Sequence, residues 1–178
     1  MAKVILSVAM SSDGYIADKN GSIDWLSCMH ESDTDYGFVK FLRSIHIIVM
    51  GKNAYNEMVA LGDWPFAEKK TYVFMDKIDQ DKRAIDKNII FFIGTVQDCI
   101  KTINTENLRA NIWLYGGAQI IQSFYTAGVI DEYILTIVPV VLGTGLALPE
   151  DIVQAKGLTE VTTKMFKDGV KQVHLLRS

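Results

Sequence analysis

The stretch from 112 to 149 places the strongest constraint on how this chain can fold. It opens with a short, apolar, β-rich run over residues 112–115, and the pair Gly116-Gly117 follows at once. The next residues carry apolar side chains at helical spacing, and a second apolar run over 133–138 closes the unit. Such runs are typical of a buried strand, a turn, a helix and another strand. The stretch therefore predicts a crossover between parallel strands.

Two readings of the diglycine are open. Glycines let the backbone approach a phosphate closely, and the N–H groups and dipole of a helix N-terminus attract an anion. Alternatively, the pair is only a tight turn. A similar junction occurs where an apolar run over 45–50 ends in Gly51-Lys52-Asn53 and a helix over 54–61 begins. Lys52 would suit a phosphate there, unless it is an ordinary surface lysine.

The remaining patterns complete an α/β fold. Further buried strands are predicted over 4–10, 71–75 and 89–93, and Thr95 is predicted to cap a helix. Alternating runs over 159–166 and 170–176 flank an Asp-Gly turn and predict a hairpin. The sum is a mixed, mainly parallel sheet with a C-terminal antiparallel hairpin, in one domain over residues 1–178.

Composition excludes several classes of protein. The chain is 49% hydrophobic and 22% charged, as globular proteins are. Its net charge of −3 gives no reason to expect nucleic acid as a partner. Neither a signal-peptide pattern nor a membrane-length apolar segment occurs, so we expect a cytoplasmic protein. Two cysteines and three histidines show no metal-binding spacing, and we expect no metal site.

Two segments stand out as candidate parts of a site. Residues 11–27 contain turn signals but no periodicity, and a loop of this length in a compact domain is usually functional. Asp35 lies in the first turn of a helix predicted to start at Ser32 or Asp33 and to end near Ser44. Its carboxylate either stabilises that helix through the dipole or projects into a cleft.

Ligands of open α/β sheets bind at the carboxyl ends of the strands. The predicted ends at Ala9-Met10, at Gly51-Lys52 and at Gly116-Gly117 would lie together there. Two phosphate-compatible turns beside an apolar slot suggest a dinucleotide. The GxGxxG fingerprint is absent, which argues against an ordinary Rossmann unit.

Short motifs, in order along nearly the whole chain, resemble dihydrofolate reductase and its relative, the riboflavin-biosynthesis reductase (RibD C-terminal) domain family. The motifs are Val8-Ala9-Met10, Tyr15-Ile16-Ala17 with Trp25, the segment 35–40, the segment 49–52, Tyr115-Gly116-Gly117-Ala118 and Leu135-Thr136. The segments 128–133 and 139–145 are more similar to the riboflavin-type reductases.

The resemblance implies a three-layer α/β/α fold and NADPH-dependent hydride transfer to a small-molecule substrate of pyrimidine or pterin type. It implies a catalytic role for Asp35 and a homodimer formed through residues 139–149, unless that apolar segment folds into the core. The implied substrate-binding residues are Met10, Val39 and Thr136. The implied cofactor-binding residues are Ala9, Ile16, Gly51, Lys52, Asn53, Gly116, Gly117, Ala118, Gln119 and Ile120.

Several positions depart from the family pattern. Ala54 replaces an expected threonine, and Asp76 would repel a 2′-phosphate if it pointed inward, although Lys77 could compensate. Preference for NADPH over NADH therefore stays open. Three functions remain: a reductase of 5-amino-6-(5-phosphoribosylamino)uracil type, a dihydrofolate reductase, and a non-catalytic dinucleotide-binding protein.

Overall fold

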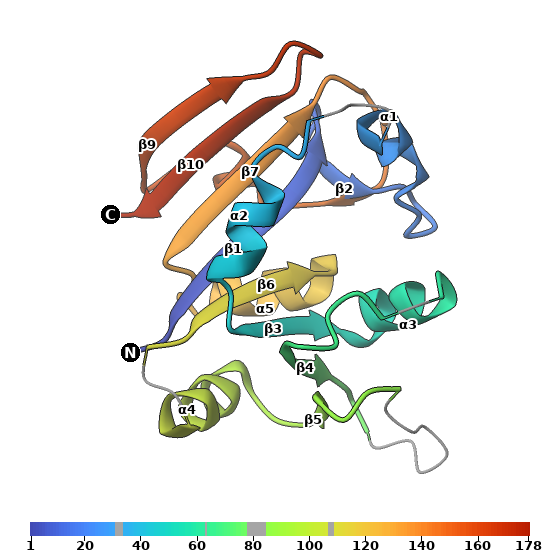
Figure 1. Ribbon diagram of the computed structural model, residues 1–178. Helices are drawn as coiled ribbons and strands as arrows, with labels where there is room; N and C mark the ends of the chain where they lie inside the picture. Colours follow the sequence, from blue (N-terminus) through green and yellow to red (C-terminus); the bar gives the residue numbers. More distant parts are fainter. Residues whose placement is uncertain (31–33, 63, 78–84, 107–108) are drawn as a thin grey trace.

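The computed structural model describes residues 1–30, 34–62, 64–77, 85–106 and 109–178 (Figure 1). Eight strands form its central sheet: β1 (Lys3–Ser11), β3 (Ile47–Gly51), β4 (Lys70–Phe74), β5 (Ile89–Phe92), β6 (Asn111–Gly116), β7 (Glu132–Val138), β9 (Leu158–Met165) and β10 (Lys171–Arg177). Their order is β5-β4-β3-β6-β1-β7-β10-β9. In this order, neighbouring strands from β5 to β7 are parallel, whereas β10 runs antiparallel to both β7 and β9. The predicted mixed sheet with a C-terminal hairpin is confirmed.

Four helices cover the two faces of the sheet and make the fold three-layered. They are α2 (Phe38–Ser44), α3 (Lys52–Ala60), α4 (Val96–Glu106) and α5 (Ala118–Thr126). Helices α4 and α5 pack on one face with Val49 and Leu114. Helices α2 and α3 pack on the other face with Ile48 and Trp113. Because successive side chains of a strand point to opposite faces, strands covered on both sides read as continuous apolar runs.

The segments between these elements contain short structures that the sequence pattern did not reveal. They are β2 (Tyr15–Ala17), η1 (Asp24–Leu26), α1 (Ser27–His30), β8 (Leu146–Ala147) and α6 (Glu150–Val153). Strand β2 pairs with β8 in a small second sheet. The predicted loop over 11–27 is thus partly ordered by a strand far along the chain.

Helix α2 begins later than predicted. The expected cap at Ser32 or Asp33 lies outside the described residues. Tyr36 and Gly37 have left-handed φ angles of 50° and 80°, so a helix cannot run through them. The helix starts at Phe38, and the carboxylate of Asp35 accepts a hydrogen bond from the Val39 N–H at 3.2 Å. The N-cap residue of α2 is Gly37, so Asp35 lies before the helix rather than in its first turn.

The connections from β3 and β6 leave the sheet in opposite directions. Strand β3 leads through α3 to β4 on one side, and β6 leads through α5 past β1 to β7 on the other side. Adjacent parallel strands whose connections diverge in this way leave a crevice at their carboxyl ends, where open α/β sheets bind ligands. Within the described part of the chain, no helix is long and apolar enough to span a membrane.

Candidate functional site

The two predicted glycine turns meet at this crevice. Gly51 ends β3 and Gly116 ends β6, and the two strands are hydrogen-bonded neighbours. A Cβ placed on Gly51 would lie 3.6 Å from Ile120 Cγ2 and 3.9 Å from the Gly116 carbonyl oxygen. The peptide bond between Gly116 and Gly117 is cis. The structure therefore brings together the two turns that the sequence places 65 residues apart.

Two of these glycines are not required by the fold. Gly51 and Gly117 have φ angles of −83° and −69°, which any residue adopts. A Cβ on Gly51 would make only ordinary contacts, and a Cβ on Gly117 would meet nothing within 4 Å. Gly116 differs, because its φ of 136° favours glycine. At Gly51 and Gly117, space is thus left where a side chain would fit.

Helices α3 and α5 begin directly at these turns and have no side-chain cap. Helix α4 shows the contrast: Thr95 Oγ1 accepts the Asp98 N–H, and Asp98 accepts the Thr95 N–H in return. The first N–H groups of a helix need partners from outside the helix. Two uncapped N-termini at one crevice form a site suited to the phosphates of a dinucleotide.

The other predicted cofactor-side residues surround the same crevice. Lys52, Asn53 and Gln119 are exposed in the first turns of α3 and α5, whereas Ile120 is buried. Ala118, the first residue of α5, is half-buried. Asp76 and Lys77 are both exposed just beyond the end of β4, which pairs with β3 so that Phe74 lies opposite Gly51. An anionic and a cationic side chain are therefore exposed beyond the carboxyl end of β4, the strand next to β3.

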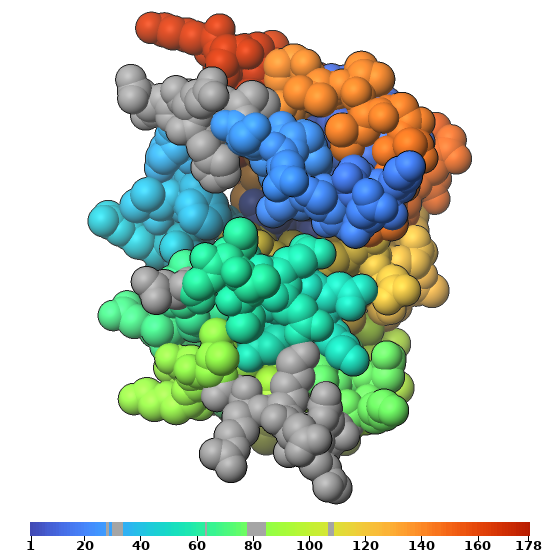
Figure 2. All heavy atoms as spheres, turned by 90° about the vertical axis from the view of Figure 1, so that its right-hand side faces the viewer, coloured from blue at the N-terminus to red at the C-terminus, as the bar shows by residue number. Residues whose placement is uncertain are grey.

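A hollow opens on the face of the molecule seen in Figure 2. It lies between residues of the β1–β2 segment and η1 (blue), helix α2 (light blue) and helix α3 (turquoise). Thr136 lies opposite Ala9 in the pairing of β7 with β1, and strand alternation puts both on the α2 side of the sheet with Ile5. Met10 instead packs with Ile16 and Ile120 on the α5 side.

Asp35 lies before α2, on the side of the sheet that α2 covers. Its Oδ1 accepts the Gly37 N–H at 3.0 Å and its Oδ2 accepts the Val39 N–H at 3.2 Å. These backbone hydrogen bonds lower the pKa of the Asp35 carboxyl. Asp35 and Val39 are both exposed. The group is an ionised acceptor at neutral pH and is poorly suited to donate a proton itself.

The segment before Ile16 is joined to the segment 139–145 by side-chain hydrogen bonds. Asp13 accepts hydrogen bonds from the Leu142 and Gly143 N–H groups at 3.1 and 2.7 Å, and a further one from the Ser11 hydroxyl. These bonds lower the pKa of the Asp13 carboxyl below its ordinary 3.8. The stabilisation is therefore present above that pH and is lost as the pH falls through the lower folded value. Ile16 itself is 8% exposed.

Gly145→Ala is expected to weaken the pairing of β2 with β8. A Cβ at Gly145 would sit far inside contact distance of the Ala17 carbonyl oxygen, where β2 meets β8. Overpacking of this kind costs about 1–3 kcal/mol, which for a chain of this size lowers Tm by roughly 3–10 °C. Thermal unfolding followed by circular dichroism measures the change. Gly117→Ala, where a Cβ meets nothing within 4 Å, is the control. If Gly145→Ala changes Tm no more than this control does, Gly145 does not approach the Ala17 carbonyl group closely.

The segment 139–149, predicted to form a dimer interface, divides into exposed and buried parts. Val141 is 74% exposed and Leu146 is 41% exposed, whereas Leu148 is buried. A homodimer through this segment stays a prediction.

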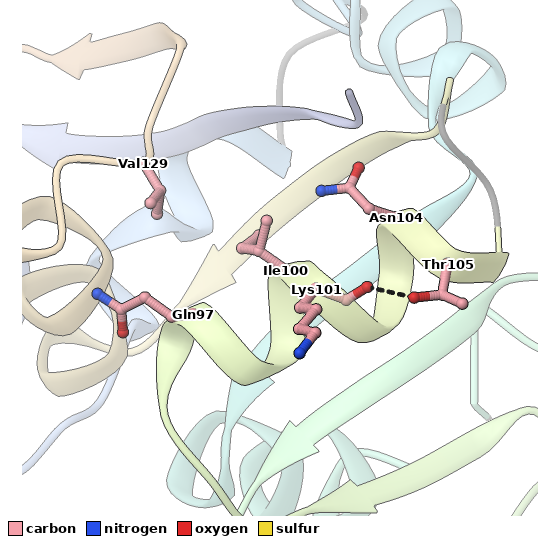
Figure 3. Close-up of a pocket in the computed structure, with 6 residues that line it drawn as sticks. All are labelled: Gln97, Ile100, Lys101, Asn104, Thr105 and Val129. Carbon is pink, nitrogen blue, oxygen red and sulfur yellow. Dashed lines mark hydrogen bonds between the residues drawn. The ribbon is translucent and has the colours of Figure 1, made fainter.

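An open groove of about 640 Å³ lies elsewhere, between α4 and the segment before β7 (Figure 3). It is lined by Gln97, Ile100, Lys101, Asn104, Thr105 and Val129. Among the described residues, no group of three or more His, Cys, Asp or Glu could hold a metal ion.

Known proteins match this chain over nearly its whole length. The profile of the RibD C-terminal domain matches residues 2–174. The uncharacterized protein YwjB of Bacillus subtilis strain 168 is 32% identical over 177 residues, covering 99% of this chain and 98% of its own. The uncharacterized protein YyaP of the same organism is 34% identical over 183 residues, covering 96% of this chain and 93% of its own.

Solved structures show the same fold. The crystal structure of a putative riboflavin biosynthesis protein from Shewanella sp. PV-4 superposes with a TM-score of 0.83 and 27% identity, covering 100% and 99% of the two chains. A deaminase/5-amino-6-(5-phosphoribosylamino)uracil reductase from Thermotoga maritima superposes with a TM-score of 0.72 and 13% identity. This chain is covered over 99% of its length and that chain over 57%. The second likeness shows the fold alone.

Proposed function

Because this chain belongs to the RibD C-terminal domain family, we propose that it is an NADPH-dependent reductase that transfers hydride to a pyrimidine- or pterin-type substrate. The model substrate is 5-amino-6-(5-phosphoribosylamino)uracil, since the solved relatives are named for riboflavin biosynthesis. One observation carries the proposal. Two uncapped helix N-termini meet at a crevice beside two glycines, Gly51 and Gly117, that the fold itself does not require.

These residues fit a nicotinamide dinucleotide. The N–H groups at the starts of α3 and α5 would bind the phosphates, and Lys52 would pair with the 2′-phosphate or a neighbouring phosphate. Ala9, Ile16 and the segment 116–120 would contact the rest of the cofactor. When bound, the nicotinamide supplies the hydride, which is chemistry that the protein's own side chains lack.

The protein's contribution is to align a C=N bond of the substrate and to exclude water from it. Val39 and Thr136 would line the substrate pocket, and Thr136 has a hydroxyl group that can donate a hydrogen bond. Asp35 would accept hydrogen bonds from an amino-pyrimidine edge as a carboxylate, which favours the protonated form of the imine nearby. Its lowered pKa keeps it ionised for this task.

A second candidate, dihydrofolate reductase, is favoured by the carboxylate at the start of α2. Dihydrofolate and the phosphoribosylamino-uracil both carry an amino-pyrimidine group, and a carboxylate acceptor recognises either of them. The two differ in the rest of the molecule, which is an aryl glutamate in one and a ribosyl phosphate in the other.

The proposal is tested by following NADPH oxidation at 340 nm with the two substrates in parallel. We expect turnover of at least one substrate, and quenching of tryptophan fluorescence on NADPH addition in the absence of substrate. Quenching without turnover of either substrate would favour the non-catalytic dinucleotide-binding protein. Absence of both signals would reject the proposed function.

Lys52→Ala is expected to weaken NADPH binding more than NADH binding. Lys52 is exposed in the first turn of α3, so its removal should leave the fold intact while a charged contact to the 2′-phosphate is lost. We expect the Kd for NADPH to rise roughly tenfold and the Kd for NADH to change less than twofold. Titrations by fluorescence give both constants. Lys101→Ala, in α4, is the charge-matched control, and equal losses for both cofactors would refute the assignment.

A further inference from the structure

Gln172, in β10, joins two elements that carry candidate substrate-side groups. Its Nε2 group donates to Thr136 Oγ1 and to the Tyr36 carbonyl oxygen, each at 3.1 Å. Gln172 lies directly opposite Thr136 in the antiparallel pairing of β10 with β7. A side-chain amide has two N–H donors, so both hydrogen bonds form at once. The C-terminal hairpin therefore contacts both β7 and the turn before α2.

The turn before α2 is held at its side chain as well as at its main chain. Tyr36 has a left-handed φ of 50°, a conformation that a non-glycine residue keeps only where its surroundings impose it. Its side chain is buried, and its ring packs edge-on against Phe166 with centroids 4.9 Å apart. Its hydroxyl donates to the carboxylate of Asp168 in the β9–β10 turn. The adjacent residue in this anchored turn is Asp35.

The contact at Thr136 fixes the direction of a hydroxyl group. Because Thr136 Oγ1 accepts from Gln172, the hydrogen of this hydroxyl is left to donate elsewhere. Thr136 is 8% exposed, so few alternative partners from solvent are available to reorient it. Gln172 thus sets Thr136 as a donor while it holds the turn that carries Asp35, an acceptor.

We propose that Gln172 is a positioning residue, which sets the Thr136 hydroxyl and the Asp35 turn together for a substrate edge that carries both an acceptor and donors. This inference rests on the proposed function for its substrate class. It adds a residue that contacts neither cofactor nor substrate and acts through two others. The matching ligand edge is that of an amino-substituted pyrimidine.

Two substitutions of similar size test the proposal. Gln172→Met keeps the length of the side chain but removes both donors. Gln172→Glu keeps its shape but turns the donor into an acceptor, so that the Thr136 hydroxyl would rotate towards it and the Tyr36 carbonyl would be repelled. We expect kcat/KM for the substrate to fall roughly tenfold in Gln172→Met and further in Gln172→Glu, with the Kd for NADPH unchanged within about twofold. A general loss of structure would move both constants.

A double-mutant cycle with Thr136→Val shows whether Gln172 acts through Thr136. We expect Gln172→Met to have a clearly smaller effect on kcat/KM in the Thr136→Val background than in the parent protein. Fully additive effects would overturn that part of the proposal.

Hydrogen exchange tests the other part without any substrate. The Gly37 and Val39 amides bond to Asp35, and we expect them to exchange faster in both Gln172 variants while the amides of β3 keep their protection. Unchanged exchange at Gly37 and Val39 would overturn the link to the Asp35 turn. If the parent protein turns over neither substrate, the proposed function fails, and the exchange measurement still decides whether Gln172 holds this turn.

Discussion

Gly51→Ala and Gly117→Ala are expected to abolish tight binding of NADPH while leaving the fold intact. At both positions the φ angle is ordinary, and a methyl group meets no atom beyond the neighbouring residues of the chain closer than 3.6 Å. The methyl group would instead occupy the space through which a phosphate approaches the N–H groups of α3 or α5. Each variant should raise the Kd for NADPH by more than about tenfold.

Stability and binding should therefore separate in these variants. We expect Tm to stay within about 3 °C of the parent value, because the conformational gain of alanine and its poorer capping nearly offset each other. Fluorescence titration and thermal unfolding measure the two quantities on the same samples. Gln122→Ala, on the exposed side of α5, is the matched control and should bind NADPH normally. Normal binding by both glycine variants would show that the crevice does not hold the dinucleotide.

Asp35→Asn is expected to reduce turnover by about 10- to 100-fold with cofactor binding unchanged. The amide oxygen of asparagine can still accept a hydrogen bond from the Gly37 or Val39 N–H, so α2 should keep its start, and the main change is loss of the negative charge. A neutral amide can no longer favour a protonated imine nearby or accept two charge-assisted hydrogen bonds from an amino-pyrimidine. Steady-state kinetics, with whichever of the two substrates the parent protein turns over, gives kcat and the KM values for that substrate and for NADPH.

Asp35→Ala separates the two tasks of this residue. It removes the hydrogen bonds to the Gly37 and Val39 N–H groups as well as the charge, so we expect a lower Tm than in Asp35→Asn together with a comparable loss of turnover. If Asp35→Asn keeps parental turnover and only Asp35→Ala loses it, the carboxylate serves the start of α2 and has no direct part in the reaction.

Local patterns predicted the sheet well because each parallel strand here is buried on both faces. Strand β6, for example, reads as an apolar run because Leu114 packs on the α5 side and Trp113 on the α2 side. The two glycine junctions were also predicted, since glycine followed by a helical pattern is a local signal. Their proximity followed from topology once the strands were taken as parallel, and the structure confirms it.

Features that depend on distant partners could not be predicted in this way. The pairing of β2 with β8 joins residues about 130 apart, and its only local trace is Gly145, one glycine among many. Gln172 sits in an alternating strand like any other polar residue, and its meeting with Tyr36 is visible only in the folded chain. The start of α2 was misplaced because the left-handed backbone at Tyr36 is imposed by contacts with the C-terminal hairpin.

The place of β1 within the sheet has a consequence for the order in which this protein can be assembled. Residues 3–6 pair with residues 111–114, and residues 5–11 pair with residues 132–138. A growing chain on the ribosome therefore holds β1 without its two partner strands until β6 and β7 have emerged. Such distant pairing slows the search for the native topology and leaves an apolar segment accessible to chaperones meanwhile. The crevice at the carboxyl ends of β3 and β6 consequently takes shape only after β6 and α5 have been made.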